Sequence, residues 1–310
     1  MQTLAVVLQQ PEQLALSSVE LLPAQDGDIV VDVEWSGIST GTEKLLWSGR
    51  MPHFPGMGYP LVPGYESLGR IAVAGSASGH SVGQRVFVPG SRCFKDVRGL
   101  FGGAASRLIV PGNRAIAVDE SIGEQGVLMA LAATAQHALV GGHPPELIIG
   151  HGVLGRLLAR LAVACGGSPV VWETRADRAT GAVGYRVIDP ATDERKDYRA
   201  IYDVSGDGSL LDRLITRLAP GGEVVLAGFY SEPLSFSFPP AFMREAKIRV
   251  AAEWREPDLH AVKALIQSGA LSLDGLITHR RPAEAASEAY RTAFEDVSCL
   301  KMVLDWRSRT

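Results

Sequence analysis

The chain has 310 residues, of which 46% are hydrophobic and 21% are charged, and its formal net charge is −4 at pH 7. This length allows two domains with separate cores, and the slightly acidic balance gives no electrostatic basis for binding nucleic acid. The most apolar stretch, residues 147–167, is interrupted by a histidine, two arginines and several glycines, so it cannot cross a bilayer. The three cysteines are scattered and the first residues lack a basic signal region, so we expect a cytoplasmic protein without a disulfide framework.

The pattern of residues 1–115 predicts a β-rich region. Residues 28–35 alternate between apolar and acidic side chains, and three further short apolar runs follow, separated by Gly, Pro and Ser turns. Two segments do not fit this pattern. They are residues 36–44 and residues 47–66, and the second is rich in Pro, Gly, Met and aromatic side chains.

A helical pattern begins near residue 126, and an apolar run then enters a glycine turn. Residues 147–155 read Leu-Ile-Ile-Gly-His-Gly-Val-Leu-Gly, and a second helical pattern follows directly. A strand, a G-x-G-x-x-G turn and a helix form the context in which this motif binds a dinucleotide. The first glycine allows the tight turn, the second lets the backbone approach a pyrophosphate, and the third lets the helix lie close to the strand. The predicted cofactor-binding residues here are Gly150, Gly152, Val153, Leu154 and Gly155.

A second predicted strand, residues 169–173, ends in a carboxylate. Glu173 lies 23 positions after Gly150, close to the offset of about 20 for the acid that holds a ribose 2′-hydroxyl. A carboxylate repels a 2′-phosphate, so NAD is favoured over NADP. Arg175 and Arg178 follow it and leave NADP open, and we include Arg178 among the cofactor-binding candidates. The structural alternative is a βαβ unit in which Glu173 is an ordinary surface residue.

Strand and helix patterns alternate as far as residue 228, which predicts a parallel sheet that binds ligands at the carboxyl ends of its strands. Those ends add Ser205, Gly206 and Gly228 to the cofactor-binding candidates. We expect residues 247–253 to form an edge strand that pairs with a second subunit. The remaining pattern predicts helices at 258–268 and 283–293 and strands at 276–279 and 301–304.

This order of regions resembles the medium-chain dehydrogenase/reductase superfamily over essentially the whole chain. Residues 33–42 resemble the Gly-Ile-Cys segment of zinc alcohol dehydrogenases, residues 63–66 (Pro-Gly-Tyr-Glu) resemble their Pro-Gly-His-Glu, and residues 102–105 resemble their Gly-Gly-x-Ala. The resemblance implies an α/β fold, a Rossmann doubly wound parallel sheet plus an N-terminal GroES-like β-rich catalytic domain. It also implies a homodimer, and it adds Thr134 to the cofactor-binding candidates. The implied domains are residues 1–132 (catalytic), 133–255 (NAD-binding) and 256–310 (a return to the catalytic domain).

The chain departs from the zinc-binding branch at the metal ligands. Ser39 stands where that branch has cysteine, Tyr65 where it has histidine, and Ala130 where a third ligand is expected. The four-cysteine lobe of that branch is also missing, since Cys93 stands alone. A tetrahedral zinc site needs Cys, His or carboxylate ligands. We therefore predict no metal.

A closer resemblance lies in residues 37–44, Gly-Ile-Ser-Thr-Gly-Thr-Glu-Lys, and residues 54–66, Phe-Pro-Gly-Met-Gly-Tyr-Pro-Leu-Val-Pro-Gly-Tyr-Glu. Both are similar to the bacteriochlorophyllide a dehydrogenases of pigment biosynthesis. The resemblance implies NAD-dependent oxidation of the 3-(1-hydroxyethyl) group of a bacteriochlorophyllide, a tetrapyrrole, to a 3-acetyl group. Two alternatives remain: a zinc-free NAD(P)H-dependent enone or quinone reductase, and a nucleotide-binding sensor that has lost activity.

The catalytic candidates are Tyr65, Ser39, Thr42 and Glu66. The superfamily geometry would aim Tyr65 and Ser39 at the reacting carbon. A tyrosine with a pKa of about 10 is a poor base at neutral pH, so Tyr65 would need an activating neighbour. In the structural alternatives, Ser39 fills a cysteine-sized space, the Tyr65 hydroxyl satisfies a buried carbonyl, and Glu66 is a structural partner.

A flat tetrapyrrole needs a wide apolar surface, and the apolar stretch that begins at Trp47 is suited to this role. The substrate-binding candidates are Trp47, Phe54, Met57 and Tyr59, and the alternative is a lid that packs on its own domain. Glu43 and Lys44 are expected to form a solvated pair. The histidines to which we give no catalytic role are His53, His137 and His151.

Overall fold

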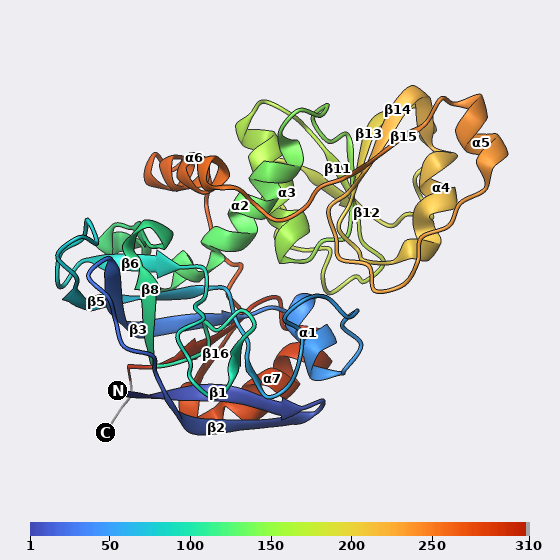
Figure 1. The fold of residues 1–310 in the computed structure, drawn as a ribbon. Helices are drawn as coiled ribbons and strands as arrows, with labels where there is room; N and C mark the ends of the chain where they lie inside the picture. Colours follow the sequence, from blue (N-terminus) through green and yellow to red (C-terminus); the bar gives the residue numbers. More distant parts are fainter. Residues whose placement is uncertain (308–310) are drawn as a thin grey trace. The chain divides into compact units, whose positions relative to one another are not determined.

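The computed structural model describes residues 1–307 and divides into two compact units (Figure 1). Unit 1 contains residues 1–130 and the end of the chain from Leu276, and unit 2 contains residues 131–275. The sequence predicts a return to the first domain at residue 256, but the chain re-enters unit 1 only at Leu276. The reason is that helix α6 (Glu256–Gln267) packs in unit 2, where the Asp258 carboxylate lies 2.8 Å from His137 Nδ1.

Unit 1 is built from two β-sheets. One has the strand order β2-β1-β4-β7, and the other has the order β16-β17-β3-β5-β6-β9 with β8 also paired to β3. The central strand, β3, has 11 residues, and its acidic side chains are half-buried between buried apolar ones. The bounds are β1 (Gln2–Gln10), β2 (Gln13–Glu20), β3 (Asp28–Ile38), β4 (Leu61–Val62), β5 (Ser67–Ala74), β6 (Arg85–Val88), β7 (Arg98–Gly99), β8 (Arg107–Pro111), β9 (Ile116–Ala117), β16 (His279–Pro282) and β17 (Met302–Asp305).

The C-terminal segment completes the core of unit 1. Strand β17 pairs antiparallel with β3, with Met302 opposite Ile38. Helix α7 buries residues 286, 289, 290, 293 and 294, and this spacing places one apolar face against the core that holds β1 and β3. The helices of unit 1 are α1 (Thr42–Trp47) and α7 (Ala286–Glu295), with the 3-10 helices η1 (Gly112–Arg114), η2 (Glu120–Leu128) and η4 (Ala283–Ala285).

Unit 2 contains a six-stranded parallel sheet with the order β12-β11-β10-β13-β14-β15. The strand order reverses direction between β10 and β13, which is where doubly wound sheets bind ligands. Figure 1 shows α3 and α4 on opposite faces of this sheet. The bounds are β10 (Leu147–Ile149), β11 (Val170–Trp172), β12 (Arg186–Ile188), β13 (Tyr198–Asp203), β14 (Leu218–Leu226), β15 (Lys247–Val250), α2 (Met129–Leu139), α3 (Val153–Ala164), η3 (Gly208–Leu210), α4 (Leu211–Ile215) and α5 (Phe238–Met243).

The predicted fold class is confirmed, and the differences are local. The sequence pattern predicts a helix at residues 210–218 and a strand at residues 223–227, with Pro-Gly-Gly at 220–222 between them. In the structure α4 ends at Ile215, and residues 220–222 form a bulge inside β14, because Leu218 already pairs with Tyr198. Strand β15 lies at an edge of its sheet, as predicted. Within residues 1–307, no helix is both long and apolar enough to cross a membrane.

Candidate functional site

The glycine turn of unit 2 connects β10 to α3. Gly150 has φ of +99°, a conformation that favours glycine, and a Cβ on Gly155 would lie only 1.9 Å from the Gly150 carbonyl oxygen. Gly152 is the N-cap of α3, and a Cβ there would meet no atom within 4 Å. No side chain caps this helix end, so the amides that begin α3 are available to an anion.

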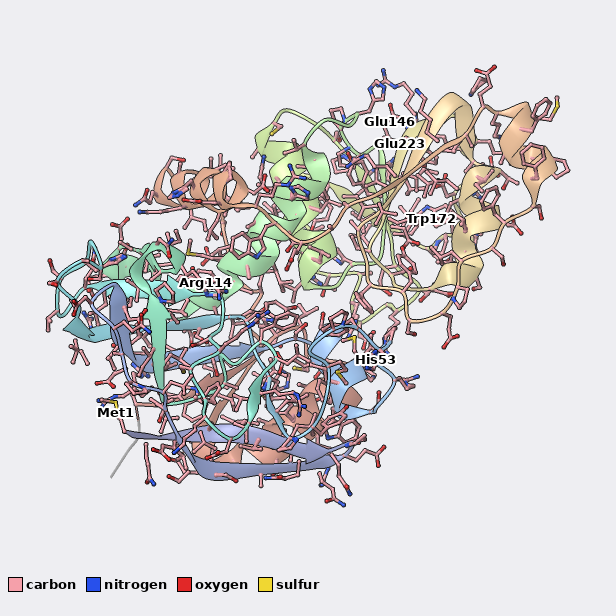
Figure 2. All side chains as sticks on the ribbon, in the orientation of Figure 1. Met1, His53, Arg114, Glu146, Trp172 and Glu223 are labelled. Carbon is pink, nitrogen blue, oxygen red and sulfur yellow. The ribbon has the colours of Figure 1, made fainter. Side chains whose placement is uncertain are left out.

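The Glu173 carboxylate lies beside this turn, at the end of β11. Its Oε2 accepts the backbone N–H of His151 at 3.3 Å, and its Oε1 accepts that of Arg175 at 3.0 Å. These two bonds hold the carboxylate beside the glycine turn. Trp172 anchors the strand that carries it, because its Nε1–H donates to the Asp193 carboxylate at 2.7 Å (Figure 2).

His151 joins the turn to the segment after β11. Its Nδ1 lies 2.6 Å from the Arg178 carbonyl and its Nε2 lies 2.9 Å from the Tyr185 hydroxyl. Burial lowers the pKa of His151 to about 4, so the ring is neutral at neutral pH. Arg156 donates to the same Arg178 carbonyl at 3.0 Å. His151 therefore organises the turn, and Arg178 contributes its backbone to the same network.

The next strand end places Ser205 beside an acid that the motifs do not mark. The amide and hydroxyl of Ser205 both donate to Asp203 Oδ1, at 2.9 and 2.6 Å. Asp203 is 1% exposed, and burial raises its pKa. Gly206 has φ of +74°, and a Cβ on Gly228 would lie 3.1 Å from the Gly206 nitrogen. The sequence signal for Asp203 is an acid that ends a buried strand two residues before Ser205 and Gly206. Thr134 lies half-buried on α2.

In unit 1 the structure brings Ser39 and Tyr65 together. The Tyr65 hydroxyl donates to Ser39 Oγ at 2.7 Å, although the two residues are 26 positions apart. Ser39 follows β3 and Tyr65 follows β4, and the Tyr65 ring is edge-on to Phe101. Burial and the neighbouring charge of Glu66 raise the pKa of Tyr65, while hydrogen bonds to Ser39 and Thr42 lower it. Tyr65 is therefore a neutral phenol at neutral pH.

Glu66 is fully buried and forms an ion pair with the Lys301 ammonium. Lys301 Nζ also donates to the Ile38 carbonyl at 3.2 Å. A Cβ on Gly37 would lie 2.2 Å from Glu66 Oε2, so the carboxylate occupies the space that glycine leaves. Among the described residues, Glu66 makes no hydrogen bond with the Tyr65 hydroxyl. Its negative charge raises the pKa of Tyr65.

Glu43 is buried, so the predicted solvated pair with Lys44 is wrong. Only 1% of Glu43 is exposed, and its Oε1 accepts the Ser39 amide at 3.0 Å while its Oε2 accepts the Tyr290 hydroxyl at 2.7 Å. Burial raises the pKa of Glu43 to about 7. Lys44 instead donates to the Phe294 carbonyl at 2.8 Å. The short motifs mark neither Tyr290 nor Lys301, because both belong to the distant C-terminal segment.

The four substrate-binding candidates pack on a small apolar cluster of unit 1. They are half-buried against Leu46, Leu61 and neighbouring side chains. Trp47 also contacts the Phe294 ring at 5.5 Å between centroids, and the Tyr59 hydroxyl donates to the Leu46 carbonyl. This packing supports the lid alternative, while the partial exposure of each side chain leaves a surface for a ligand. His53 lies in the same segment and is exposed (Figure 2).

The donor set of unit 1 does not fit a zinc ion. The two ligand positions carry the Ser39 hydroxyl and the Tyr65 phenol, whose raised pKa opposes the anionic form, and the third position is Ala130. Across residues 1–307, no three His, Cys, Asp or Glu side chains gather in a way that could hold a metal.

Known proteins with this architecture are alcohol dehydrogenases. Residues 25–120 match the alcohol dehydrogenase GroES-like domain. An NADH complex of the Escherichia coli CFT073 alcohol dehydrogenase rspB matches with a TM-score of 0.83 and 21% identity over 98% of this chain and 99% of that one. Escherichia coli L-idonate 5-dehydrogenase matches with a TM-score of 0.85 and 17% identity over 98% of each chain. These comparisons show that the chain has the fold of these dehydrogenases.

Two relatives with higher identity show to which dehydrogenase family the chain belongs. The chain is 59% identical over 316 residues to the 2-desacetyl-2-hydroxyethyl bacteriochlorophyllide A dehydrogenase of Cereibacter sphaeroides, with 99% of each chain covered. It is 58% identical over 311 residues to the enzyme of that name from Rhodobacter capsulatus, again with 99% of each covered. The chain belongs to this bacteriochlorophyllide dehydrogenase family.

Proposed function

We propose that this protein oxidises the 3-(1-hydroxyethyl) group of a bacteriochlorophyllide to a 3-acetyl group with NAD and without catalytic zinc. Identity of 59% over 99% of the chain to a relative of that name carries the substrate assignment. The hydrogen-bonded pair of Tyr65 and Ser39 supports the zinc-free mechanism, because it occupies the positions of two metal ligands.

The reaction removes a hydride from the carbinol carbon and a proton from its hydroxyl, and it yields the ketone, NADH and a proton. When bound, the nicotinamide accepts the hydride. Tyr65 donates its own proton to Ser39, so the lone pairs of its oxygen are free to accept a hydrogen bond from the substrate hydroxyl. The carbinol is attached to a conjugated macrocycle, which we expect to ease hydride loss relative to an aliphatic alcohol. Hydrogen bonding then takes the place of Lewis-acid activation.

Unit 2 holds the cofactor in this proposal. The glycine turn binds the pyrophosphate through backbone amides, and Glu173 binds the ribose hydroxyls. The fixed carboxylate of Glu173 favours NAD, because a 2′-phosphate would place like charges together. The other proposed cofactor contacts are Val153, Leu154, Arg178, Ser205, Gly206, Gly228 and Thr134.

The apolar segment of unit 1 offers a surface to the macrocycle. Trp47, Phe54, Met57 and Tyr59 are half-buried, so each keeps part of its apolar surface exposed while the small cluster beneath holds it in place. A pre-positioned apolar surface suits a large flat pigment, because few side chains must be ordered on binding.

We also propose a homodimer formed through β15. This strand is an unpaired edge of the unit 2 sheet, and its Val250 is 74% exposed. The nearby segment that precedes it exposes further large apolar side chains, Phe238 at 66%, Phe242 at 65% and Met243 at 75%. An exposed apolar edge strand is a template for pairing with another strand. Val250→Lys should shift the mass measured by light scattering from two chains to one, and an unchanged dimer would remove β15 from the interface.

An absorbance scan of the purified protein with NAD and a 3-hydroxyethyl bacteriochlorophyllide tests the activity. Formation of the acetyl group extends the conjugation, so the longest-wavelength band should move to the red as NADH appears. Metal chelators should leave the rate unchanged. Binding of NAD without any spectral change would contradict the proposal and favour the enone reductase or the sensor, which assays with NADPH and enones would separate.

A further inference from the structure

Glu43 connects the Ser39–Tyr65 pair to the C-terminal helix. We propose that Glu43 is a positioning residue for the reaction, which acts through the backbone of Ser39 and is itself held by Tyr290. This inference rests on the proposed function, because it assigns Tyr65 and Ser39 to the reacting hydroxyl.

The contacts form one continuous chain from the reacting pair to α7. Tyr65 donates to Ser39 Oγ at 2.7 Å, the Ser39 amide donates to Glu43 Oε1 at 3.0 Å, and Tyr290 donates to Glu43 Oε2 at 2.7 Å. Each carboxylate oxygen therefore receives one donor, and only an ionised carboxyl can accept both without rearrangement. The position of the Ser39 hydroxyl depends on this clamp, because Ser39 lies between the end of β3 and the start of α1.

Within the described residues, Glu43 forms no ion pair with a positively charged side chain. The ionisable groups that face it are Tyr65 and Glu66 from the segment between β4 and β5, Lys301 directly before β17, and Tyr290 from α7. The single ammonium, that of Lys301, is paired with Glu66. Two buried carboxyls thus share one positive charge, and burial raises the pKa of Glu43, which has no ammonium paired with it, to about 7.

The ionised form of Glu43 favours the productive arrangement. It accepts both donors, and its negative charge raises the pKa of Tyr65, which keeps the phenolic proton on Tyr65 and directed at Ser39. Protonation of Glu43 removes the negative charge that holds both donors, and a proton on Oε2 reverses the hydrogen bond with Tyr290, whose hydroxyl then accepts instead of donating. We therefore expect kcat for alcohol oxidation to rise with pH through the neutral range.

Three variants test this positioning role through kcat and its pH profile. Glu43→Gln keeps the shape but lacks the charge, so kcat should fall about tenfold and the rise through neutral pH should disappear, with the KM for NAD unchanged. Glu43→Asp keeps the charge but is one methylene shorter, so it should lower kcat and retain the pH-dependent rise. Tyr290→Phe removes a hydrogen bond that stabilises the Glu43 carboxylate, so the rise should move to higher pH.

Lys44→Met is the matched control. Lys44 lies on the same helix and also contacts α7, through the Phe294 carbonyl, but it makes no contact with Ser39 in the described residues. Its pH profile should remain that of the wild type. The inference is overturned if Glu43→Gln retains the wild-type profile, or if Lys44→Met loses the rise as Glu43→Gln does.

A measurement without substrate separates this inference from the proposed function. Infrared difference spectra of the free enzyme should show the carbonyl stretch of a buried carboxyl that titrates in the neutral range and is absent in Glu43→Gln. If the wild type shows this band but oxidises no bacteriochlorophyllide, the proposed function fails while the coupling of Glu43 to the site stands. If the band is absent from the wild type, the inference about Glu43 fails by itself.

Discussion

The candidate cofactor site of unit 2 is built from backbone groups, whereas the candidate site of unit 1 is built from buried side chains. The glycine turn depends on the absence of side chains: Gly150 has a positive φ, a Cβ on Gly155 would clash with the Gly150 carbonyl oxygen, and Gly152 leaves open space. It also depends on the amides that begin α3, which no side chain caps. The Ser39–Tyr65 pair depends on carboxylates and hydroxyls that hold one another inside the protein. A backbone site tolerates changes of the side chains around it, while a side-chain network transmits each change to its neighbours.

The largest expected effects come from adding a single Cβ to the glycine turn. Gly155→Ala places that atom 1.9 Å from the Gly150 carbonyl oxygen, so we expect about 1–3 kcal/mol of destabilisation together with loss of NAD binding. Gly152→Ala meets no atom within 4 Å and should leave the melting temperature unchanged while NAD affinity falls at least about tenfold. Thermal unfolding and NADH titration measure the two effects. Wild-type NAD affinity in Gly152→Ala would contradict the proposal that the backbone of the glycine turn binds the cofactor.

Tyr65→Phe tests the side-chain site directly. We expect kcat to fall by about 10²-fold, because the hydroxyl that accepts a hydrogen bond from the reacting alcohol is lost, with little change in the KM for NAD. Tyr202→Phe is the control, since its hydroxyl bonds a carbonyl in unit 2 and lies outside the candidate site. Full turnover by Tyr65→Phe would remove this residue from the mechanism.

Glu43→Gln should also change how stability depends on pH. The folded-state pKa of about 7 lies above the ordinary value of 4.5, so the folded protein binds more protons than the unfolded chain between these values. The wild type therefore loses stability as pH rises from 4.5 to 7, by up to about 3 kcal/mol, and the variant avoids this loss. As the pH rises from 5 to 8, the melting temperature of Glu43→Gln should increase relative to that of the wild type. A constant difference would show that the Glu43 carboxyl is ionised throughout.

Glu173→Ala should change the choice of cofactor. A hydrogen bond to a charged group contributes about 1.5–3 kcal/mol, so we expect the preference for NADH over NADPH to fall at least about tenfold. The ratio of kcat/KM for the two cofactors measures this. A preference unchanged from that of the wild type would show that the glycine turn alone selects the cofactor.

The smallest expected effect is at the apolar surface of unit 1. Replacing both Phe54 and Tyr59 by Ala should raise the KM for pigment several-fold and leave NAD affinity unchanged. The melting temperature should also fall, because both side chains pack on the cluster around Leu46 and Leu61. A lower melting temperature with unchanged pigment kinetics would identify the segment as a lid without a role in binding.

The same contrast explains what the sequence could predict. A glycine turn is contiguous, so residues 147–155 and Glu173 predict a dinucleotide site from the sequence alone. The family predicted from the resemblance of residues 54–66 is confirmed. The buried network draws on residues 247 positions apart, as between Glu43 and Tyr290, and no local pattern relates them. Glu43 also follows a Gly-Thr pair that is typical of an exposed turn, but it is buried between the Ser39 amide and Tyr290 of α7. The Pro-Gly-Gly sequence at residues 220–222 is a turn signal, but pairing with β13 continues on both sides of it, so the strand begins earlier than the local pattern predicts.

The discontinuity of unit 1 has a consequence for biosynthesis. Unit 2 is one continuous segment, so all of it has been translated before the ribosome reaches Leu276. The last segment to be translated contains Tyr290, Lys301 and β17, which pairs with β3. Until it is made, Glu43 lacks its partner Tyr290 and Glu66 lacks its partner Lys301. A nascent chain can thus acquire a nucleotide-binding fold well before it acquires a finished catalytic half. If the proposed function is correct, a message truncated near codon 275 would yield a chain that still contains the candidate cofactor site but lacks Tyr290 and Lys301.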